Sequence, residues 1–216
     1  MAGLVLHNYF RSSTSIRVRV ALNLKGIDYA YVAHHLRRGE HRGNAYRAIN
    51  PHALVPALEL ADGTKLTQSL AIIEYLDEAF PEPPLLPATP PARARVRAIA
   101  QAIACEIHPL NNLRVLNYLR SDLQQDDMGV GTWYRHWVTE GFRGLEQQAR
   151  ELSAAGRYCF GDAISLADVY LVPQMFNARR MKTDLTPFPT LVGISTHLES
   201  LPAFDAARPE VQPDAQ

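Results

Sequence analysis

The hydrophobic pattern of the first eighty residues changes period several times, which is typical of short strands that alternate with helices. Leu4–Phe10 is a short run rich in strand-forming residues, and Tyr29–His34 has the same character. Between them, Ser12–Lys25 begins with hydroxyl residues and is followed directly by Gly26, the pattern of a capped helix. These positions predict a β-α-β unit with a right-handed crossover between parallel strands.

The pattern after this unit predicts a hairpin and another helix. A polar stretch leads to a short helix that ends at Asn50-Pro51. Two strand-like runs, Ala57–Leu60 and Lys65–Thr67, flank the turn Asp62-Gly63 and predict an antiparallel hairpin. An amphipathic helix over Ser69–Phe80 completes the order β-α-β, short α, β-β-α. We therefore expect a thioredoxin-like α/β domain.

The rest of the chain has helical periodicity. The segment 81–91, PEPPLLPATPP, holds six prolines in eleven residues and predicts a stiff linker. Helices are expected over about 92–119 and 132–152, and a third begins at a capping box formed by Ser165 and Asp168. The predicted organisation is a thioredoxin-like domain over residues 1–82, a linker over 83–91 and an all-helical domain over 92–216, with a frayed tail RPEVQPDAQ.

Composition narrows the class of partner. The chain has 216 residues, 47% of them hydrophobic and 20% charged, which is enough to build a buried core. Its 22 basic residues balance 22 acidic ones, and this argues against nucleic acid or an anionic membrane held by bulk charge. The sequence has neither an apolar run long enough to span a bilayer nor the pattern of a secretory signal. We expect a cytoplasmic protein.

Cysteine and histidine usage indicates neither a metal site nor disulfide chemistry. Cys105 and Cys159 form no CxxC motif, and we expect both to be buried small hydrophobic residues. Thioredoxin-type disulfide exchange is disfavoured, since no cysteine precedes residue 105. His34, His35 and His41 lie close together, but the sequence has no second cluster to complete a metal-ligand set.

Arginine is the default cation of this chain, which has 19 Arg and 3 Lys, so a single Arg is weak evidence of an anion site. Arg17 and Arg19 stand two residues apart on a predicted helix and cannot both face one site. We expect internal ion pairs for them. Tyr9 precedes Phe10 on the first predicted strand and is expected to be packed.

Three features of the first domain indicate a ligand site. The sequence RSSTS at residues 11–15 places hydroxyls and free amides at a helix N-terminus, which favours an anion. Val55-Pro56 precedes a strand, and in a thioredoxin-like fold a cis bond here would expose the Val55 backbone to an extended peptide. Gln68-Ser69 opens another helix and suits a carboxylate. Together they predict a site for a small anionic peptide.

With these features in place, several longer stretches resemble the zeta class of the glutathione transferase family, which includes the maleylacetoacetate and maleylpyruvate isomerases. The resemblance extends over nearly the whole chain, with the motifs in the order typical of the class. The stretches that carry it are YFRSSTSIRVRVALNLKGIDY, INPHALVPALEL, QSLAIIEYLDEAFPEPPLLP, GDAISLADVYLVPQ and RRMKTDLTPFP.

The resemblance implies glutathione as cofactor, a homodimer and a defined set of site residues. Thr14 replaces a Cys common in the class and Ile16 replaces an aromatic residue or His, so the hydroxyl that faces the sulfur is left open, with Ser12 the usual candidate. The implied thiol site is Ser12, Ser13 and Thr14. The other implied glutathione contacts are His41, Val55, Gln68 and Ser69, with His108, Asn112 and Arg114 lining the cleft. The implied substrate arginines are Arg11, Arg114 and Arg180.

The resemblance therefore implies a glutathione-dependent cis–trans isomerase. A glutathione thiolate would add reversibly to the double bond of a maleyl keto-acid, a small dicarboxylate, and the three arginines would converge on that dianion. Maleylacetoacetate and maleylpyruvate are both left open as the substrate. The alternatives are a general zeta-class transferase that conjugates or dehalogenates small electrophilic acids, and a non-enzymatic binding module that has lost its thiol site.

Overall fold

A computed structural model describes residues 3–216 of the chain, which divides into two compact units. The first unit comprises the chain up to Pro84 together with Leu201–Gln216, and the second unit is Leu85–Ser200. Within the described residues, no helix is both long enough and apolar enough to cross a membrane.

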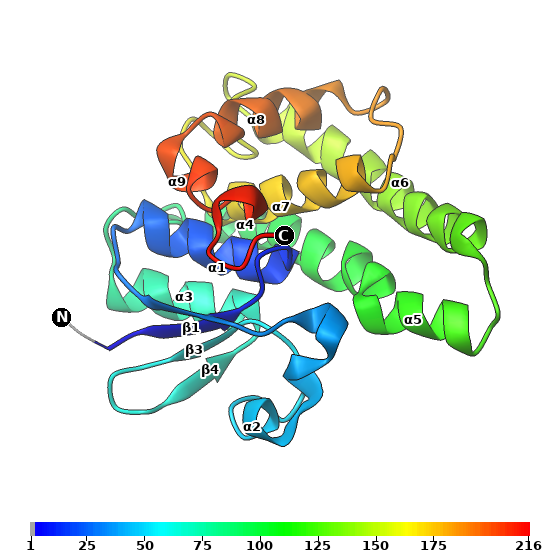
Figure 1. Ribbon diagram of the computed structural model, residues 1–216. Helices are drawn as coiled ribbons and strands as arrows, with labels where there is room; N and C mark the ends of the chain where they lie inside the picture. The colour runs from blue at the N-terminus through cyan, green and yellow to red at the C-terminus, as the bar shows by residue number, and fades with distance from the viewer. Residues whose placement is uncertain (1–2) are drawn as a thin grey trace. The chain divides into compact units, whose positions relative to one another are not determined.

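A mixed four-stranded sheet forms the centre of the first unit (Figure 1). Its strands are β1 (Val5–Asn8), β2 (Ala30–Ala33), β3 (Ala57–Glu59) and β4 (Lys65–Thr67), in the order β2-β1-β3-β4. The strand β1 pairs in parallel with β2 and antiparallel with β3, and β3 pairs antiparallel with β4. The β-α-β unit and the hairpin predicted from the sequence are therefore confirmed.

The helices α1 (Ser13–Leu24) and α3 (Ser69–Ala79) cover one face of this sheet, while α2 (Asn44–Arg47) lies on the other side (Figure 1). Leu6 and Leu58 face each other across β1 and β3 and are fully buried. Two short 3-10 helices, η1 (Leu36–Arg38) and η2 (Glu40–Arg42), precede α2. The apolar face of the sheet thus holds α1 and α3, and each of these helices begins at a residue of the predicted ligand site.

The two buried arginines of α1 do not face one site, as expected, but Arg19 does not form the expected ion pair. The side chains of Arg17 and Arg19 are both almost fully buried. Arg17 Nη1 donates a hydrogen bond to Ser69 Oγ on α3 at 3.3 Å. Arg19 donates instead to neutral oxygens at the end of β1 and to the carbonyl of Ala207. A buried guanidinium needs several acceptors, and backbone carbonyls supply them here.

The C-terminal segment, Leu201–Gln216, corrects the predicted domain boundary. The sequence placed it in the helical domain with a frayed tail, but the structure packs it in the first unit, where it forms α9 (Pro202–Asp205) and the 3-10 helix η5 (Pro209–Val211). In Figure 1 this red segment lies against α1 and the end of β1. Asn23 Nδ2 on α1 donates to the Ala203 carbonyl at 2.9 Å. Such side-chain bonds order a segment that its composition alone leaves undetermined.

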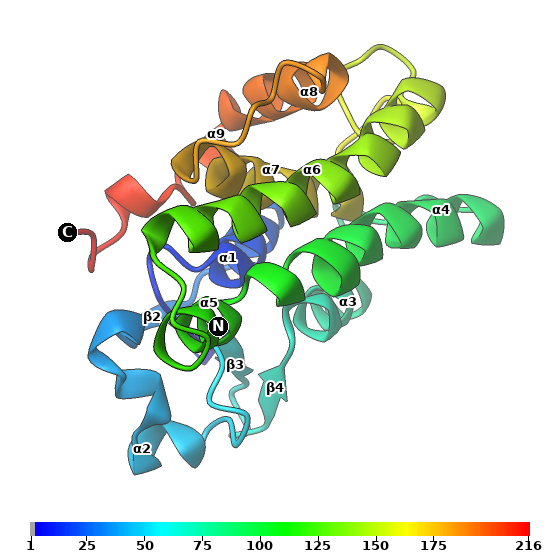
Figure 2. The same cartoon turned by 90° about the vertical axis from the view of Figure 1, so that its right-hand side faces the viewer.

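The second unit consists of packed helices (Figure 2). The helices are α4 (Pro90–Gln101), α5 (Leu113–Ser121), α6 (Asp127–Leu152), α7 (Leu166–Arg180) and α8 (Pro189–Glu199). Ser165 and Asp168 form the predicted capping box at the start of α7.

One predicted helix of this unit is wrong. The sequence pattern indicated a single helix over about 92–119, whereas the chain passes from α4 through a π-helical turn, Ala102–Ile107, and a 3-10 turn, Pro109–Asn111, before α5 starts. Pro109 lacks the amide proton that a continuous helix needs. Asn112 then has extended backbone angles, and its side chain accepts the Arg114 amide as the N-cap of α5. His108 and Asn112 are therefore not an i, i+4 pair on one helix.

The two cysteines differ in environment. Cys159 is buried, as predicted, and burial raises the pKa of its thiol well above the ordinary value. Cys105 lies on the π-helical turn and is exposed, which corrects the expectation for this residue. Irregular helical turns change which side chains face the core, and the apolar period of the sequence does not show this.

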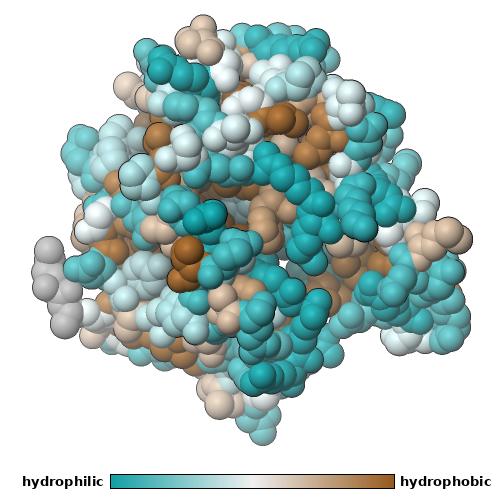
Figure 3. Space-filling model, turned by 45° about the horizontal axis from the view of Figure 1, so that its top comes forward, coloured by the Kyte–Doolittle hydropathy of each residue, from teal (hydrophilic) through white to brown (hydrophobic). Residues whose placement is uncertain are grey.

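The outer surface is of mixed polarity. On the face drawn in Figure 3, hydrophobic residues are scattered among hydrophilic ones. Large hydrophobic side chains that are at least half exposed among the described residues are Tyr118, Leu123, Met128 and Val211.

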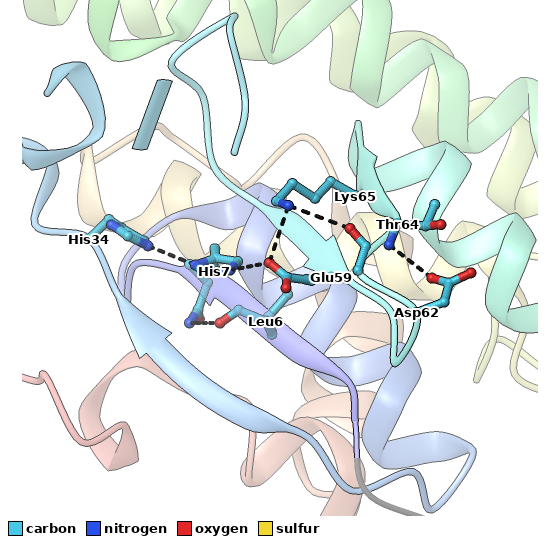
Figure 4. A network of polar contacts seen from close by, with 9 residues as sticks. Leu6, His7, His34, Glu59, Asp62, Thr64 and Lys65 are labelled. Atoms are coloured by element: carbon cyan, nitrogen blue, oxygen red, sulfur yellow. Dashed lines mark hydrogen bonds and ion pairs between the residues drawn. The ribbon is translucent and has the colours of Figure 1, made fainter. Parts of the chain in front are cut away.

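A histidine pair joins β1 to the end of β2 (Figure 4). His7 Nδ1 and His34 Nε2 lie 3.0 Å apart, so one ring must donate its proton to the other. His7 Nε2 lies 3.7 Å from Glu59 Oε2 on β3, and Lys65 Nζ on β4 lies 3.8 Å from the same oxygen. The ring of Tyr46 on α2 packs against His34. The pair is therefore a shared polar contact between the sheet and α2.

Candidate active site

The start of α1 carries a chain of hydroxyl groups. Ser12 is the N-cap: its Oγ accepts the Ser15 amide at 3.3 Å and lies 2.8 Å from Thr14 Oγ1. Thr14 Oγ1 donates to the Val55 carbonyl at 2.9 Å. A hydroxyl has one proton, so the proton between Ser12 and Thr14 comes from Ser12. The chain of donors runs from Ser12 through Thr14 to Val55.

This polarity distinguishes the hydroxyls of the RSSTS motif. The proton of Thr14 is held by the Val55 carbonyl, whereas the proton of half-buried Ser12 points only to another hydroxyl. Ser12 can turn its proton to an incoming anion at lower cost than Thr14 can. Ser13, the third predicted residue, is buried as the first residue of α1. The first turn of α1 has no acidic side chain, so its amides keep their positive potential.

The loop before β3 brings Val55 to this helix. The Val55–Pro56 peptide is cis, as the sequence predicted. The preceding carbonyl, that of Leu54, accepts both the Tyr46 hydroxyl and Asn50 Nδ2 at 2.7 Å. Ala53 has φ +53°, a left-handed conformation that is unfavourable for alanine. Two side chains of the α2 region thus hold the loop, and its tip contacts Thr14.

The start of α3 is a second electropositive position. Gln68 is exposed and has φ +69°, a strained backbone conformation of the kind that gathers at functional sites. Ser69 is buried, and its Oγ accepts from the Arg17 guanidinium. The first turn of α3 has no acidic residue. A buried cation below a helix N-terminus favours a carboxylate at this point.

His41 lies buried on η2, with 6% of its surface exposed. Burial is the main cause that lowers its pKa, and the charges of Arg42 and Arg47 act in the same direction. Its Nδ1 has no hydrogen-bond partner among the residues that the structure describes. A neutral, buried ring nitrogen of this kind is suited to a polar ligand group.

Arg11 lies beside two aromatic rings of the first unit. Its Nη2 donates to the Tyr9 hydroxyl at 3.2 Å, and its guanidinium lies 5.0 Å from the centre of the Phe10 ring. Tyr9 itself is buried, as predicted. The contacts with both rings fix the direction of Arg11 at the turn before Ser12.

The remaining predicted residues belong to the second unit. His108 and Asn112 are half-buried at the break between α4 and α5, and Arg114 is exposed on α5. Arg180 is the last residue of α7 and is exposed, with its Nη2 3.5 Å from Asn177 Oδ1. Convergence of Arg11, Arg114 and Arg180 is still a prediction.

The same helix α7 contains a polar residue that sequence reasoning missed. Gln174 is 1% exposed, and both atoms of its amide group have no hydrogen-bond partner among the described residues. Gln174, Asn177 and Arg180 are spaced three residues apart and share one side of α7. Buried Tyr134 on α6 has its pKa raised to about 12 by desolvation, while the nearby charge of Arg180 acts in the opposite direction. A glutamine within an apolar run was the available signal.

The sequence also did not indicate the roles of Arg19 and Asp214, which both contact the turn before Ser12. An Arg-Val-Arg triplet inside a helix that is otherwise apolar was the signal for Arg19. For Asp214 the sequence holds no signal, because its partners are more than a hundred residues away.

Comparison with known proteins identifies the family of this chain. The family model for the N-terminal domain of glutathione S-transferases matches residues 6–84. A probable maleylacetoacetate isomerase of Vibrio cholerae is 49% identical over 218 residues, which cover 100% of both chains. Both matched regions include the starts of α1 and α3 and the Val55–Pro56 loop.

Solved structures give the same result over both units. The holo structure of a maleylpyruvate isomerase, a bacterial zeta-class glutathione S-transferase, has a TM-score of 0.95 at 46% identity and covers 98% of this chain and 100% of its own. A maleylacetoacetate isomerase from Methylobacterium extorquens with bound malonate and GSH has a TM-score of 0.94 at 39% identity, with coverages of 98% and 99%.

Proposed function

Because this chain belongs to the zeta class of the glutathione transferase family, we propose that it is a glutathione-dependent cis–trans isomerase of a maleyl keto-acid. The observation that carries the proposal is the full-length similarity to maleylacetoacetate and maleylpyruvate isomerases. The start of α1 supports the proposal independently, because its first turn has no acidic side chain and the Ser12 hydroxyl can turn its proton towards a ligand.

Glutathione is the cofactor, and the first unit has groups that fit each part of it. Ser12 and the amides at the start of α1 suit the sulfur. Buried Ser69, above the Arg17 guanidinium, and strained Gln68 suit the γ-glutamyl carboxylate. The Val55 backbone suits the cysteinyl unit. The Nδ1 of His41, which has no hydrogen-bond partner among the described residues, suits another polar group of the tripeptide.

Bound glutathione supplies a thiolate, the nucleophile that makes and breaks a single bond at the substrate's double bond. The protein's part is to favour the charged form, since a free thiol has a pKa near 8.5. Ser12 donates its proton to the sulfur after turning away from Thr14. The amides of the first turn of α1 add positive potential there.

The substrate is a dianion when both carboxyl groups are ionised. Arg11, Arg114 and Arg180 each offer a planar fork that pairs with a carboxylate through two hydrogen bonds. His108 and Asn112 add hydrogen-bonding groups for the ketone oxygen, on which negative charge develops. Such preorganised donors lower the barrier to rotation about the former double bond.

The direct test is an assay of maleylacetoacetate and maleylpyruvate with glutathione at a small fraction of the substrate concentration. Complete conversion to the fumaryl isomer, with glutathione recovered unchanged, supports isomerisation. Consumption of one glutathione per product would instead identify a conjugating transferase. The ratio of kcat/KM for the two substrates assigns the keto-acid.

Arg180→Ala should lower kcat/KM by a factor that corresponds to about 2–4 kcal/mol of lost transition-state stabilisation, because a carboxylate of the substrate loses its charged partner. Arg180→Lys keeps the charge but loses the planar fork, so it should recover only part of the activity. Glutathione affinity, measured by calorimetry, should change little in either variant.

Neighbouring Arg179 provides a matched control, since it pairs with Glu199 on α8. Arg179→Ala should keep kcat/KM within about threefold of the wild-type value. A fall in glutathione affinity that parallels the loss of activity in Arg180→Ala would assign Arg180 to the cofactor site.

We also propose that the protein is a cytoplasmic homodimer that acts in the breakdown of aromatic compounds. The support is family membership, together with a substrate class that such breakdown produces. Light scattering at micromolar concentration tests the dimer: a mass near 24 kDa, that of one chain, would contradict it.

A further inference from the structure

The C-terminal segment contacts the turn that presents Ser12. This turn runs from Asn8, the last residue of β1, to Ser12, the N-cap of α1. Within the turn, the Ser12 amide donates a backbone hydrogen bond to the Tyr9 carbonyl at 3.0 Å. Because the first unit includes Leu201–Gln216, the far end of the chain can supply further contacts here.

Asp214 binds the N–H side of this turn. The Phe10 amide donates to Asp214 Oδ2 at 3.2 Å, and the Tyr31 hydroxyl on β2 donates to Oδ1. Burial and this bond to Asp214 raise the pKa of Tyr31, so the tyrosine is a neutral donor at physiological pH. The carboxylate therefore links the turn to the edge strand of the sheet.

Arg19 binds the carbonyl side of the same turn. Its Nη2 donates to the Phe10 carbonyl at 2.8 Å and to the Ala207 carbonyl at 3.0 Å, and its Nη1 donates to Asn8 Oδ1 at 2.9 Å. Both peptide groups of Phe10 are thus held, one by Asp214 directly and one by an arginine that Ala207 also binds. Both connections involve the C-terminal segment.

We propose that Asp214 is a positioning residue for the thiol site: by holding the Phe10 amide, it fixes the direction from which Ser12 meets glutathione. This inference rests on the proposed function of Ser12 and adds the C-terminal segment to the site. Without the carboxylate, the Phe10 amide loses its acceptor and the turn relaxes. The Ser12 hydroxyl then meets the sulfur less well, and placement errors of about 1 Å are known to slow catalysis by up to a hundredfold.

The test compares four variants of the full-length protein. Asp214→Ala removes both bonds, and Asp214→Asn keeps one acceptor oxygen. Tyr31→Phe removes the link to β2 while leaving the bond to Phe10. Glu210→Ala, on the same segment, is the control, because it removes an exposed charge that has no hydrogen bond with the described residues. Circular dichroism and thermal unfolding establish that each variant is folded.

Two readouts are independent of turnover. The first is the thiol pKa of bound glutathione, followed by the ultraviolet absorbance of the thiolate as a function of pH. The second is hydrogen exchange of the amides of residues 9–15 in the protein without glutathione. The kcat and the glutathione Kd are measured alongside.

For Asp214→Ala we expect faster exchange in residues 9–15, a thiol pKa raised by about half a unit and a kcat lowered about tenfold, with Kd changed by less than about threefold. Asp214→Asn should lie between this variant and the wild type. Tyr31→Phe should keep a thiol pKa near the wild-type value, even if its melting temperature falls. Glu210→Ala should match the wild type in every readout.

A folded Asp214→Ala variant with wild-type exchange and thiol pKa would overturn the proposal, as would a Tyr31→Phe variant that loses as much as Asp214→Ala, since that result would indicate support of the fold alone. If Asp214→Ala does not fold, Asp214→Asn decides on the same readouts. Failure of the proposed function is a different result: the wild type itself would then bind no thiolate and isomerise neither acid.

Discussion

The N-termini of α1 and α7 are capped in different ways. At α7, the buried carboxylate of Asp168 accepts the Ser165 amide and the Cys159 amide at 2.8 Å and the Ser165 hydroxyl at 3.0 Å. At α1, the cap is the neutral hydroxyl of Ser12, and no acidic side chain lies in the first turn. One helix start is neutralised by the chain's own carboxylate, and the other is not.

The start of α8 shows that α7 is not a special case in the second unit. Glu146 on α6 accepts the Thr190 and Leu191 amides, both at 3.0 Å. Helix dipoles attract negative charge, and a carboxylate from within the chain satisfies this attraction permanently. A start capped only by hydroxyls keeps it for a ligand. Under the proposed function, this difference separates the starts of α7 and α8, which stabilise the fold, from the start of α1, which would bind the thiolate.

The strongest test of this difference gives α1 the type of cap that α7 has. Asp is as good an N-cap as Ser, so Ser12→Asp should fold. Its carboxylate would accept the amides of the first turn and repel a thiolate, so the thiol pKa should rise. The kcat/KM should fall more than a hundredfold, which corresponds to about 3–4 kcal/mol of lost transition-state stabilisation. Steady-state kinetics over a range of pH would measure both effects.

Ser12→Ala is the matched control, because it removes the hydroxyl without adding charge. Ser12→Ala should lose about 1.5–3 kcal/mol of transition-state stabilisation, measured as kcat/KM, which is the value of a hydrogen bond to a charged group. Thr14→Val should cost less, since Thr14 acts only through Ser12 and Val55. If Ser12→Ala is silent and Thr14→Val is inactive, Thr14 rather than Ser12 faces the sulfur.

The converse change removes the carboxylate from α7. Asp168→Ala leaves two buried amides and a hydroxyl without their acceptor, and should lower the free energy of unfolding by about 2–3 kcal/mol. Urea unfolding measures this loss. Glutathione affinity of the folded protein should be unchanged, since the proposed site lies on α1 and α3. Exposed Asp162, six residues earlier, is the control: Asp162→Ala should alter stability by less than about 0.5 kcal/mol.

The smallest expected effect is a difference between the two units in how acid changes their stability. Burial lowers the pKa of His7, where the charge of Glu59 opposes the shift and that of Lys65 adds to it. Burial also lowers the pKa of His34, to about 4, where Glu40 opposes the shift and His41 adds to it. Between pH 6.5 and 4 the unfolded chain binds a proton at His34 and the folded chain does not, and the lowered pKa of His7 acts in the same direction, so stability falls as pH falls. Burial acts oppositely on Asp168, whose pKa is raised, so acid does not weaken the start of α7.

From pH 7 to pH 5 we expect a loss of about 1 kcal/mol from the histidine pair, allowing for its partial exposure to solvent. Urea unfolding at the two pH values measures this loss in the wild type and in His34→Gln. The variant should show a smaller difference between the two pH values. An equal difference would mean that His34 titrates as it does in the unfolded chain.

The local elements of the fold could be predicted because their signals lie within a few residues. The Ser165–Asp168 capping box, the turn at Asp62-Gly63 and the start of α1 at Ser12 each depend on side chains near their own backbone. The pattern placed Gln68-Ser69 at a helix start and Val55-Pro56 before a strand, while their contacts with glutathione followed from the resemblance to a known family. These parts needed no knowledge of which distant segments meet.

Other features depend on packing. The break at Pro109 lay within a continuous apolar period, so the pattern indicated one helix where the chain forms four segments. The partners of Arg19 are carbonyls, which every residue of the sequence possesses, and only folding selects which ones surround a buried guanidinium. The pairing of His7 with His34 likewise depends on the register of β1 against β2.

The sequence by itself determined the strands and helices of the first unit up to α3, the capping box at the start of α7 and the family that the chain resembles, because these properties are local or inherited along the chain. The tertiary structure decided that the C-terminal segment returns to the first unit and that Asp214 meets Phe10, 204 residues away in sequence. The reason is physical. A hydrogen bond between such distant residues forms only when burial of the intervening chain has offset the entropy of bringing them together, and no local pattern records that balance.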